Sequence, residues 1–142
     1  MIIVEKRMNL FEVDKKYFLA HCISADHKMG AGIAVDFNKK FRLESQFQSM
    51  EQSGVRIMVG DAWLIGRVFN LITKAKYYGK PTYQTLQMAL DEMKELCELK
   101  NIKYLAMPKI GCGLDRLSWG IVREMLQDTF KNTNIEILVC SL

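Results

Sequence analysis

Apolar residues recur along the chain with two spacings, and these spacings predict alternating strands and helices. Short apolar runs bounded by glycine or polar residues predict strands at 2–5, 18–23, 55–59, 67–72, 102–107 and 135–140. Apolar residues three or four positions apart predict helices at 32–40, at 43–52, from Thr82 onward and at 118–131. This order predicts a single domain over residues 1–142 with an α/β fold, a three-layer α/β/α sandwich around a mixed central sheet.

Two glycine-rich loops follow two of the predicted strands. Residues 29–32 (MGAG) come after the strand at 18–23, and residues 108–118 come between the strand at 102–107 and a helix. A strand, a glycine turn and a helix start together bring backbone N–H groups and the helix dipole to a phosphate. Ligands of such sheets bind beyond the carboxyl ends of the strands, where both loops are expected. We therefore expect the two loops to hold a diphosphate from two sides.

Composition and charge narrow the class of protein. Apolar residues at 49% and charged residues at 25% are values of an ordinary globular domain. No apolar run approaches the ~20 residues of a membrane span, and residues 1–6 (MIIVEK) lack the order of a signal peptide. These features predict a cytoplasmic protein with no membrane partner. The net charge of +4 mildly favours anionic partners, but scattered basic residues do not by themselves indicate a nucleic-acid binder.

The four cysteines point to neither a metal site nor a disulfide framework. Cys22, Cys97, Cys112 and Cys140 are far apart and show no CxxC or other metal-ligand spacing. We expect reduced, mostly space-filling thiols, no metal and no cofactor. Cys112 stands between two glycines, yet no histidine is near it in sequence to activate it as a nucleophile.

Four motifs together resemble a known family. They are residues 21–34 (HCISADHKMGAGIA), 71–74 (LITK), 80–83 (KPTY) and 108–117 (PKIGCGLDRL). At these spacings the chain resembles the macrodomains of the terminal ADP-ribose protein glycohydrolase type, from about Leu10 to its C-terminus. The resemblance implies a macrodomain fold with a cleft for ADP-ribose. It also implies release of ADP-ribose held by an ester on acidic side chains, and deacylation of O-acyl-ADP-ribose.

The resemblance further implies two catalytic residues. In the family mechanism a lysine attacks the anomeric carbon of the distal ribose and an acid resolves the adduct, and these roles fall on Lys74 and Asp115. Burial favours the neutral, nucleophilic form of an amine at a strand end, and a carboxylate beside the glycine turn can shuttle a proton. From the residues alone, Lys74 is more readily interpreted as a surface lysine and Asp115 as a helix N-terminal acid favoured by the dipole.

The remaining site residues are expected to line the cleft. The predicted ligand-binding set is Asn9, Leu10, Ser24, Gly30, Gly32, Ile33, Pro108, Gly111, Gly113, Leu114 and Asp115. The glycines let the backbone approach the ligand, Ile33 and Leu114 form apolar walls, and Pro108 shapes its loop. Ser24 either donates to a ribose hydroxyl or phosphate or caps a turn. Asn9 stands where many macrodomains have an acid that accepts from the adenine amino group, which weakens that bond by about 1–2 kcal/mol.

Three functions stay open at this point. The first is a hydrolase of ADP-ribosyl esters, whose partner is ADP-ribose or an ADP-ribosylated protein. The second is a non-catalytic ADP-ribose reader, and the third is a hydrolase of ADP-ribosylated DNA bases, so a nucleic-acid partner is possible but not favoured. We expect a monomer, with His21 in the core and His27 facing solvent.

Overall fold

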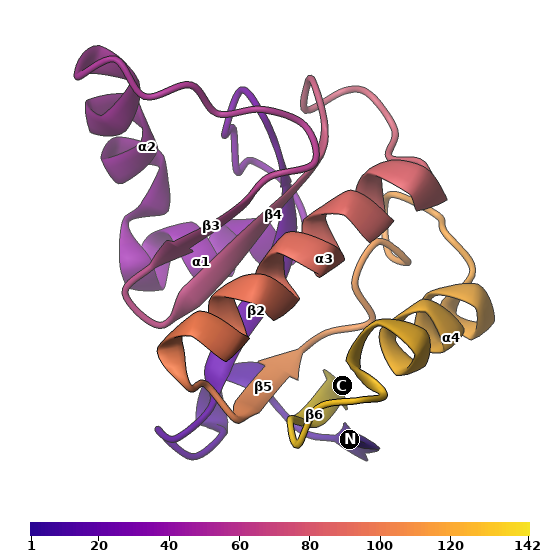
Figure 1. Ribbon diagram of the computed structural model, residues 1–142. Helices are drawn as coiled ribbons and strands as arrows, with labels where there is room; N and C mark the ends of the chain where they lie inside the picture. Colours follow the sequence, from indigo (N-terminus) through magenta and orange to yellow (C-terminus); the bar gives the residue numbers. More distant parts are fainter.

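The computed structural model describes residues 1–142 and shows one six-stranded sheet between two layers of helices (Figure 1). The strands are β1 (Ile2–Arg7), β2 (Phe18–Ser24), β3 (Ala62–Ile65), β4 (Val68–Lys74), β5 (Tyr104–Met107) and β6 (Glu136–Ser141). The helices are α1 (Ile33–Phe41), α2 (Leu43–Gln52), α3 (Tyr83–Lys100) and α4 (Trp119–Phe130), with a 3₁₀ turn at Leu10–Glu12. The strand order is β1-β6-β5-β2-β4-β3, parallel throughout except for β3, which runs antiparallel to β4.

Alternate residues of the central strands enter two separate hydrophobic cores. Leu19 of β2 packs with α1 and α2, and its neighbour Ala20 packs with α3 and α4. Val68 and Phe69 divide in the same way on β4. Because side chains alternate across a strand, near-continuous apolar runs are what a sheet buried on both faces requires. The predicted α/β/α sandwich with a mixed sheet is therefore confirmed.

Local signals account for the helix boundaries. The Thr82 side chain accepts from the Thr85 N–H, and the Thr85 hydroxyl accepts from the Thr82 N–H, so the two form a reciprocal cap at the start of α3. The Thr85 hydroxyl also donates to the Thr73 carbonyl at 2.7 Å, which ties α3 to the end of β4. Asn101 ends α3 in the left-handed conformation. All helices carry too many polar residues, or are too short, to cross a bilayer.

The prediction of a strand at 55–59 is wrong, and β3 lies a few residues later. Residues 55–58 are irregular, and a turn follows in which Gly60 has φ +96° and the Asp61 carboxylate accepts from the Met58 N–H at 2.9 Å. Ile65 then pairs with Val68, so only two residues separate β3 from β4. A glycine in such a two-residue connection, Gly66 at φ +58°, is a hairpin signal that the strand assignment overlooked.

A buried histidine joins β2 to β4. As predicted, His21 lies in the core, fully buried and stacked on Phe37 with ring centroids 3.9 Å apart. Its Nε2 lies 2.6 Å from Asn70 Oδ1, while the Asn70 amide donates to the carbonyls of Trp63 and Val68. The asparagine oxygen must therefore accept, which makes Nε2–H the donor and leaves Nδ1 unprotonated. Burial lowers the pKa of His21 to about 4.

Candidate active site

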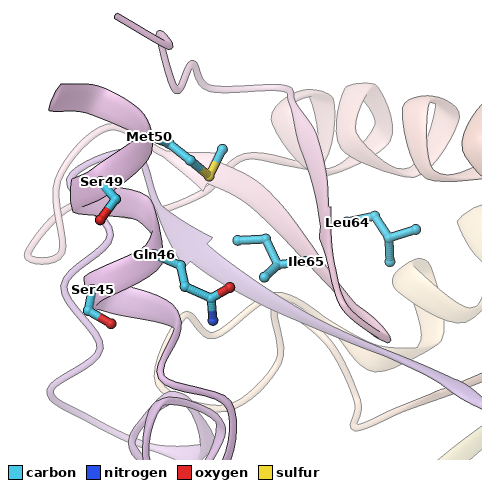
Figure 2. A pocket seen from close by; sticks show the side chains of 6 residues that line it. All are labelled: Ser45, Gln46, Ser49, Met50, Leu64 and Ile65. Carbon is cyan, nitrogen blue, oxygen red and sulfur yellow. The ribbon is translucent and has the colours of Figure 1, made fainter. Parts of the chain in front are cut away.

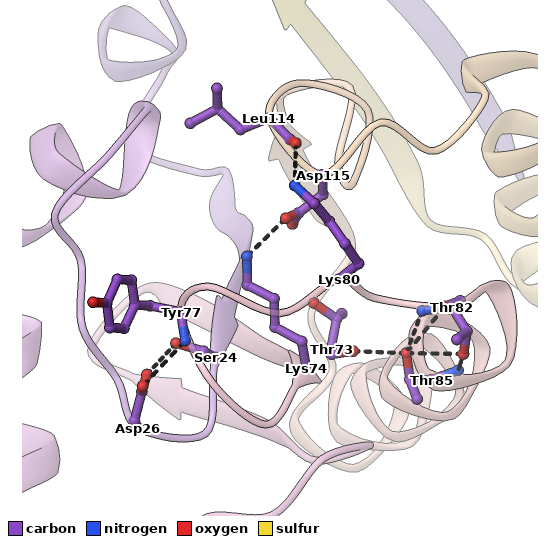
Figure 3. A network of polar contacts seen from close by, with 10 residues as sticks. All are labelled: Ser24, Asp26, Thr73, Lys74, Tyr77, Lys80, Thr82, Thr85, Leu114 and Asp115. Atoms are coloured by element: carbon purple, nitrogen blue, oxygen red, sulfur yellow. Dashed lines mark hydrogen bonds and ion pairs between the residues drawn. The ribbon is translucent and has the colours of Figure 1, made fainter.

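The two residues predicted to be catalytic are in direct contact. Lys74 ends β4, and its Nζ donates to Asp115 Oδ1 at 2.7 Å across 41 residues of sequence (Figure 3). Both side chains are only 15% exposed. The contact joins an amine and a carboxylate at the carboxyl end of the sheet, where parallel α/β sheets hold their ligands.

Ser24 lies beside Lys74 because β2 and β4 are parallel neighbours. The pairing shifts between Ile23 and Ser24, so that Ser24 stands opposite Lys74. Irregularities of this kind occur next to active sites, where they re-aim a side chain. The Ser24 hydroxyl donates to Asp26, as Figure 3 shows, so its oxygen stays free to accept. Asp26 was not foreseen from the sequence.

Asp26 connects Ser24 to the segment that follows Lys74. Its second carboxylate oxygen accepts from the Tyr77 N–H at 3.1 Å. Burial opposes ionisation of Asp26, but hydrogen bonds from Ser24 and from the N–H groups of Tyr77 and Lys28 lower the pKa of this carboxyl below its ordinary value. The carboxylate therefore fixes two parts of the site at once.

The first glycine loop, residues 25–32, is held by α2. The Met29 N–H donates to the Glu44 carboxylate, and His27 Nε2 lies 2.5 Å from Glu51 Oε1. The prediction that His27 faces solvent is wrong: it is 8% exposed, because its ring stacks on Phe47 and its nitrogen meets Glu51. Two carboxylates of α2 thus set the path of the chain into Gly30 and Gly32.

The second glycine loop, residues 108–118, is held by the segment after Lys74. Lys80 Nζ donates to the Leu114 carbonyl at 3.0 Å, and the Tyr83 hydroxyl accepts from the Ser118 N–H at 3.0 Å. These two bonds flank Asp115 on both sides. The sequence contains both anchors in one motif, but nothing in their spacing showed which loop they would reach.

Glycine is required at defined points of the two loops. Gly32 has φ +60° and Gly111 has φ +72°, a conformation that other residues adopt at a cost. A Cβ at Gly32 would lie 3.4 Å from Leu114 Cδ1, so the tips of the two loops approach each other. A Cβ at Gly30 or Gly113 would meet no atom within 4 Å, which leaves open space for a ligand there.

The other predicted ligand contacts differ in what they can offer. Leu114 is 64% exposed, and Ile33 and Pro108 are half-buried, so all three can still touch a ligand. Leu10 is buried in the core, which leaves only its backbone for a contact. Asn9 is exposed, but its Oδ1 already accepts from the Phe11 N–H at 2.9 Å.

Asn9 and Lys74 mark the two ends of the carboxyl edge. Asn9 follows β1, which lies four strand spacings from β4 in the sheet order. At the usual separation of neighbouring strands this span is roughly 19 Å. An elongated ligand is needed to contact both ends.

The thiols near Asp115 are poor nucleophiles. Burial, together with the neighbouring Asp115 and Cys112, raises the pKa of Cys22 to about 12. Burial also raises the pKa of Cys112, whose Sγ donates to the Ile110 carbonyl at 3.2 Å. Both are therefore protonated at neutral pH. No group of three or more His, Cys, Asp or Glu side chains is arranged to hold a metal ion.

Two surface hollows lie away from the Lys74–Asp115 pair. One of about 420 Å³ lies between α2 and β3 and is lined by Ser45, Gln46, Ser49, Met50, Leu64 and Ile65 (Figure 2). Another of about 390 Å³ includes residues 101–103 and 132–135, which precede β5 and β6 at the opposite end of the sheet. Neither contains a predicted site residue, so the chemistry of the Lys74–Asp115 pair, and not the size of a hollow, marks the candidate site.

Comparison with known families explains the arrangement. The Macro domain family model matches residues 21–126, which include both glycine loops and the Lys74–Asp115 pair. The chain belongs to the Macro domain family. This macrodomain is 44% identical over 137 residues to the ADP-ribose glycohydrolase OARD1 of Homo sapiens, and 42% identical to that of Bos taurus. Each alignment covers 94% of this chain and 88% of the relative.

Solved structures agree with the fold of this macrodomain. The macrodomain of Thermus aquaticus DarG superposes with a TM-score of 0.86 at 20% identity, covering 99% of both chains. Thermosipho africanus DarTG in complex with ADP-ribose gives a TM-score of 0.83 at 19% identity, over 98% of this chain and 41% of that one. At such low identity these likenesses establish the fold alone.

Proposed function

We propose that this macrodomain is an ADP-ribose glycohydrolase that releases ADP-ribose from esters with acidic side chains. The observation that carries the proposal is the 2.7 Å contact between Lys74 and Asp115 at the carboxyl edge of the sheet. The relatives named ADP-ribose glycohydrolase, which are 44% and 42% identical over most of the chain, support the same class of reaction.

In the proposed mechanism Lys74 is the nucleophile. Its amine forms a bond to the anomeric carbon of the distal ribose, and the bond from that carbon to the ester oxygen breaks, so the target carboxylate leaves. The amine must lose a proton in this step, and Asp115, at 2.7 Å, is within reach to accept it. The sugar ring of the adduct then opens to an imine between Lys74 and the ribose, and water adds to the imine carbon. Asp115 returns a proton to the departing amine, and ADP-ribose and free Lys74 result.

The two glycine loops bind the rest of the ligand. We propose that the backbone at Gly30, Gly32, Gly111 and Gly113 approaches the diphosphate. The sheet edge between β4 and β1 then accommodates the adenosine portion toward Asn9. Since one chain supplies every part of this site, a monomer suffices for the activity.

Deacylation of O-acyl-ADP-ribose is a second reaction that we propose for the same residues. Its substrate is also an ester of the distal ribose, but it carries no protein. With the acyl group on the anomeric oxygen, attack by Lys74 breaks the same bond from the anomeric carbon to that oxygen, and the acyl group leaves as its carboxylate. The proposal is specific, because the reaction must disappear in the same variants that lose release from a protein.

Turnover of a glutamate-linked mono-ADP-ribosylated protein tests the proposal. Lys74→Ala and Asp115→Ala are each expected to lower kcat by more than about 100-fold, with ADP-ribose binding retained in calorimetry. Lys100→Ala, at the exposed end of α3, is the matched control and keeps the wild-type rate.

Two results would contradict the proposal. Near wild-type rates in both folded variants would exclude the Lys74 mechanism. Binding of ADP-ribose by the wild type without release from any ester would instead identify a reader.

A further inference from the structure

A turn with two exposed tyrosines directly follows Lys74. The Gly79 N–H donates to the Lys76 carbonyl at 2.9 Å, so Tyr77 and Tyr78 occupy the two corner positions of a β-turn. Tyr77 and Tyr78 are 55% and 72% exposed, and their rings meet edge to face with centroids 5.3 Å apart. Neither ring belongs to a hydrophobic core, so packing gives no reason for two aromatic residues here.

The turn is fixed relative to the candidate active site. The Tyr77 N–H donates to Asp26, and Lys28 Nζ lies 5.0 Å from the centroid of the Tyr77 ring. On the other side, Lys80 is bonded to the Leu114 carbonyl beside Asp115. Figure 3 shows Tyr77 beside Ser24 and Asp26, with Lys74 between them and Asp115. The two tyrosines therefore lie at the edge of the site in a fixed position.

The surface around this turn carries positive charge. Lys28 and Lys76 are exposed, and neither forms an ion pair in the structure. The nearby carboxylate of Asp26 already accepts hydrogen bonds from Ser24 and from the Tyr77 N–H. Asp115 is paired with Lys74. Two lysine cations beside the tyrosines are thus available to a binding partner.

Resting on the proposed function, we propose that Lys28, Lys76, Tyr77 and Tyr78 bind the peptide segment next to the modified side chain and favour acidic residues in it. The carboxylate that leaves at Lys74 belongs to a target peptide. Because the turn directly follows Lys74, the backbone of that peptide must pass close to it. Lysine ammonium groups attract acidic side chains, and exposed tyrosine rings give the peptide an apolar surface. The four residues will be called the rim.

The chemistry of the rim favours an acidic peptide over a nucleic acid. Binding to single-stranded nucleic acid combines a basic groove along the backbone with free aromatic faces for the bases. Here the Lys28 ammonium already lies over one face of the Tyr77 ring, so a base cannot stack on that face. The net charge of +4 is also small for a surface that must follow a phosphate backbone.

Two synthetic peptides with one ester-linked ADP-ribosyl glutamate test the proposal, one with Asp and Glu around the modified residue and one with Ser and Gln. The wild type is expected to prefer the acidic peptide by about fivefold in kcat/KM at low salt, and less at high salt. The double variant K28Q/K76Q loses the preference, and Tyr78→Ala lowers kcat/KM for both peptides. The matched charge control K100Q/K131Q keeps the wild-type preference.

Two further measurements separate this proposal from the function on which it rests. O-acyl-ADP-ribose has no peptide, so the rim variants hydrolyse it at the wild-type rate if the rim acts on peptides alone. Binding of both peptides to Lys74→Ala, followed by fluorescence anisotropy, gives the preference without any turnover. A hydrolase that fails entirely but binds the acidic peptide more tightly would overturn the proposed function and support the rim.

Three outcomes would overturn the rim proposal. One is equal kcat/KM and equal affinity for the two peptides in the wild type. Another is a preference that survives in K28Q/K76Q. The third is an ADP-ribosylated oligonucleotide whose turnover falls in K28Q/K76Q while that of both peptides does not change, which would make the rim a nucleic-acid surface.

Discussion

The two glycine loops border the same site, but different parts of the chain hold them. The first loop, residues 25–32, is bound through Met29 and His27 to two carboxylates of α2. The second loop, residues 108–118, carries Asp115 and is bound by Lys80 and Tyr83, which follow Lys74 in the chain. The start of the first loop also meets the Lys74 segment, where the Asp26 carboxylate accepts from the Tyr77 N–H, but its glycine end is bound only to a helix with no part in the chemistry. The second loop, which carries Asp115, is bound to the Lys74 segment on both sides of that residue.

This difference separates binding from catalysis in the molecule. The segment 80–83 links the strand that ends in Lys74 to the loop with Asp115, so the geometry of the pair depends on it. The first loop contributes backbone near Gly30 and Gly32 but no reacting group. Changes in the first loop should therefore alter ligand affinity, and changes in the second loop should alter turnover.

The largest effect on stability is expected in the sheet beneath the site, at the bond between His21 and Asn70. His21 belongs to β2, which leads to the first loop, and Asn70 belongs to β4, which ends in Lys74. Burial holds the folded-state pKa of His21 at about 4, below its ordinary value of 6.5. The unfolded chain therefore binds a proton between pH 6.5 and 4 that the folded chain does not, so this stability is present above 6.5 and is lost as the pH falls to about 4.

Urea unfolding at pH 7 and pH 4 measures this loss. The wild type should lose about 3 kcal/mol more of its free energy of unfolding than His21→Gln, whose amide can still donate to Asn70. The same pH dependence in both proteins would show that His21 is not the titrating group. Acid is thus expected to destabilise the whole domain, whereas each of the changes that follow acts on one loop.

The second loop is next, because Gly111 cannot be replaced without strain. A Cβ there would lie 2.9 Å from Leu117 Cδ1, and φ is +72°. Gly111→Ala is expected to lower the free energy of unfolding by about 1–2 kcal/mol and kcat by about tenfold or more, as Asp115 shifts. Gly113→Ala, whose Cβ meets nothing within 4 Å, should leave the melting temperature unchanged. Equal melting temperatures for the two variants would contradict the assigned strain.

The smallest effects compare one anchor of each loop. Glu44→Ala removes the acceptor of the Met29 N–H and should raise the Kd for ADP-ribose about fivefold with kcat nearly unchanged. Tyr83→Phe removes the acceptor of the Ser118 N–H and should lower kcat about threefold with Kd nearly unchanged. Calorimetry and single-turnover kinetics on both variants measure the split. The reverse split, or equal effects on Kd and kcat in both, would remove the distinction between the loops.

Elements with strong periodicity were predictable from the sequence, and the exceptions have physical causes. The helices begin within about a residue of their predicted starts, because Thr82 caps one and glycine turns precede others. The prediction of a strand at 55–59 was wrong because an apolar run alone does not show which residues pair with a neighbouring strand. The hairpin at Gly66 pairs residues 62–65 with β4 instead.

The candidate site was predictable in its residues more than in its contacts. Resemblance to the family supplied Lys74 and Asp115, whereas their contact depends on β4, β2 and β5 being neighbours, which no local pattern reveals. His27 was misplaced because its partner Glu51 is 24 residues away. The hydrogen bonds of Asp26 and Tyr83 could not be predicted for the same reason, because their partners are also far away in sequence.

The most direct test of the account is the mass of the protein trapped during turnover. The wild type and Asp115→Asn are mixed with the glutamate-linked substrate, and a borohydride reductant converts an imine between an amine and the opened ribose into a stable bond. The account predicts one added ADP-ribose on the proteolytic peptide that contains Lys74 in both proteins, because Asp115→Asn slows formation and resolution of the adduct but leaves the attacking amine in place. Continued release of ADP-ribose with no adduct, or an adduct on another lysine, would contradict it.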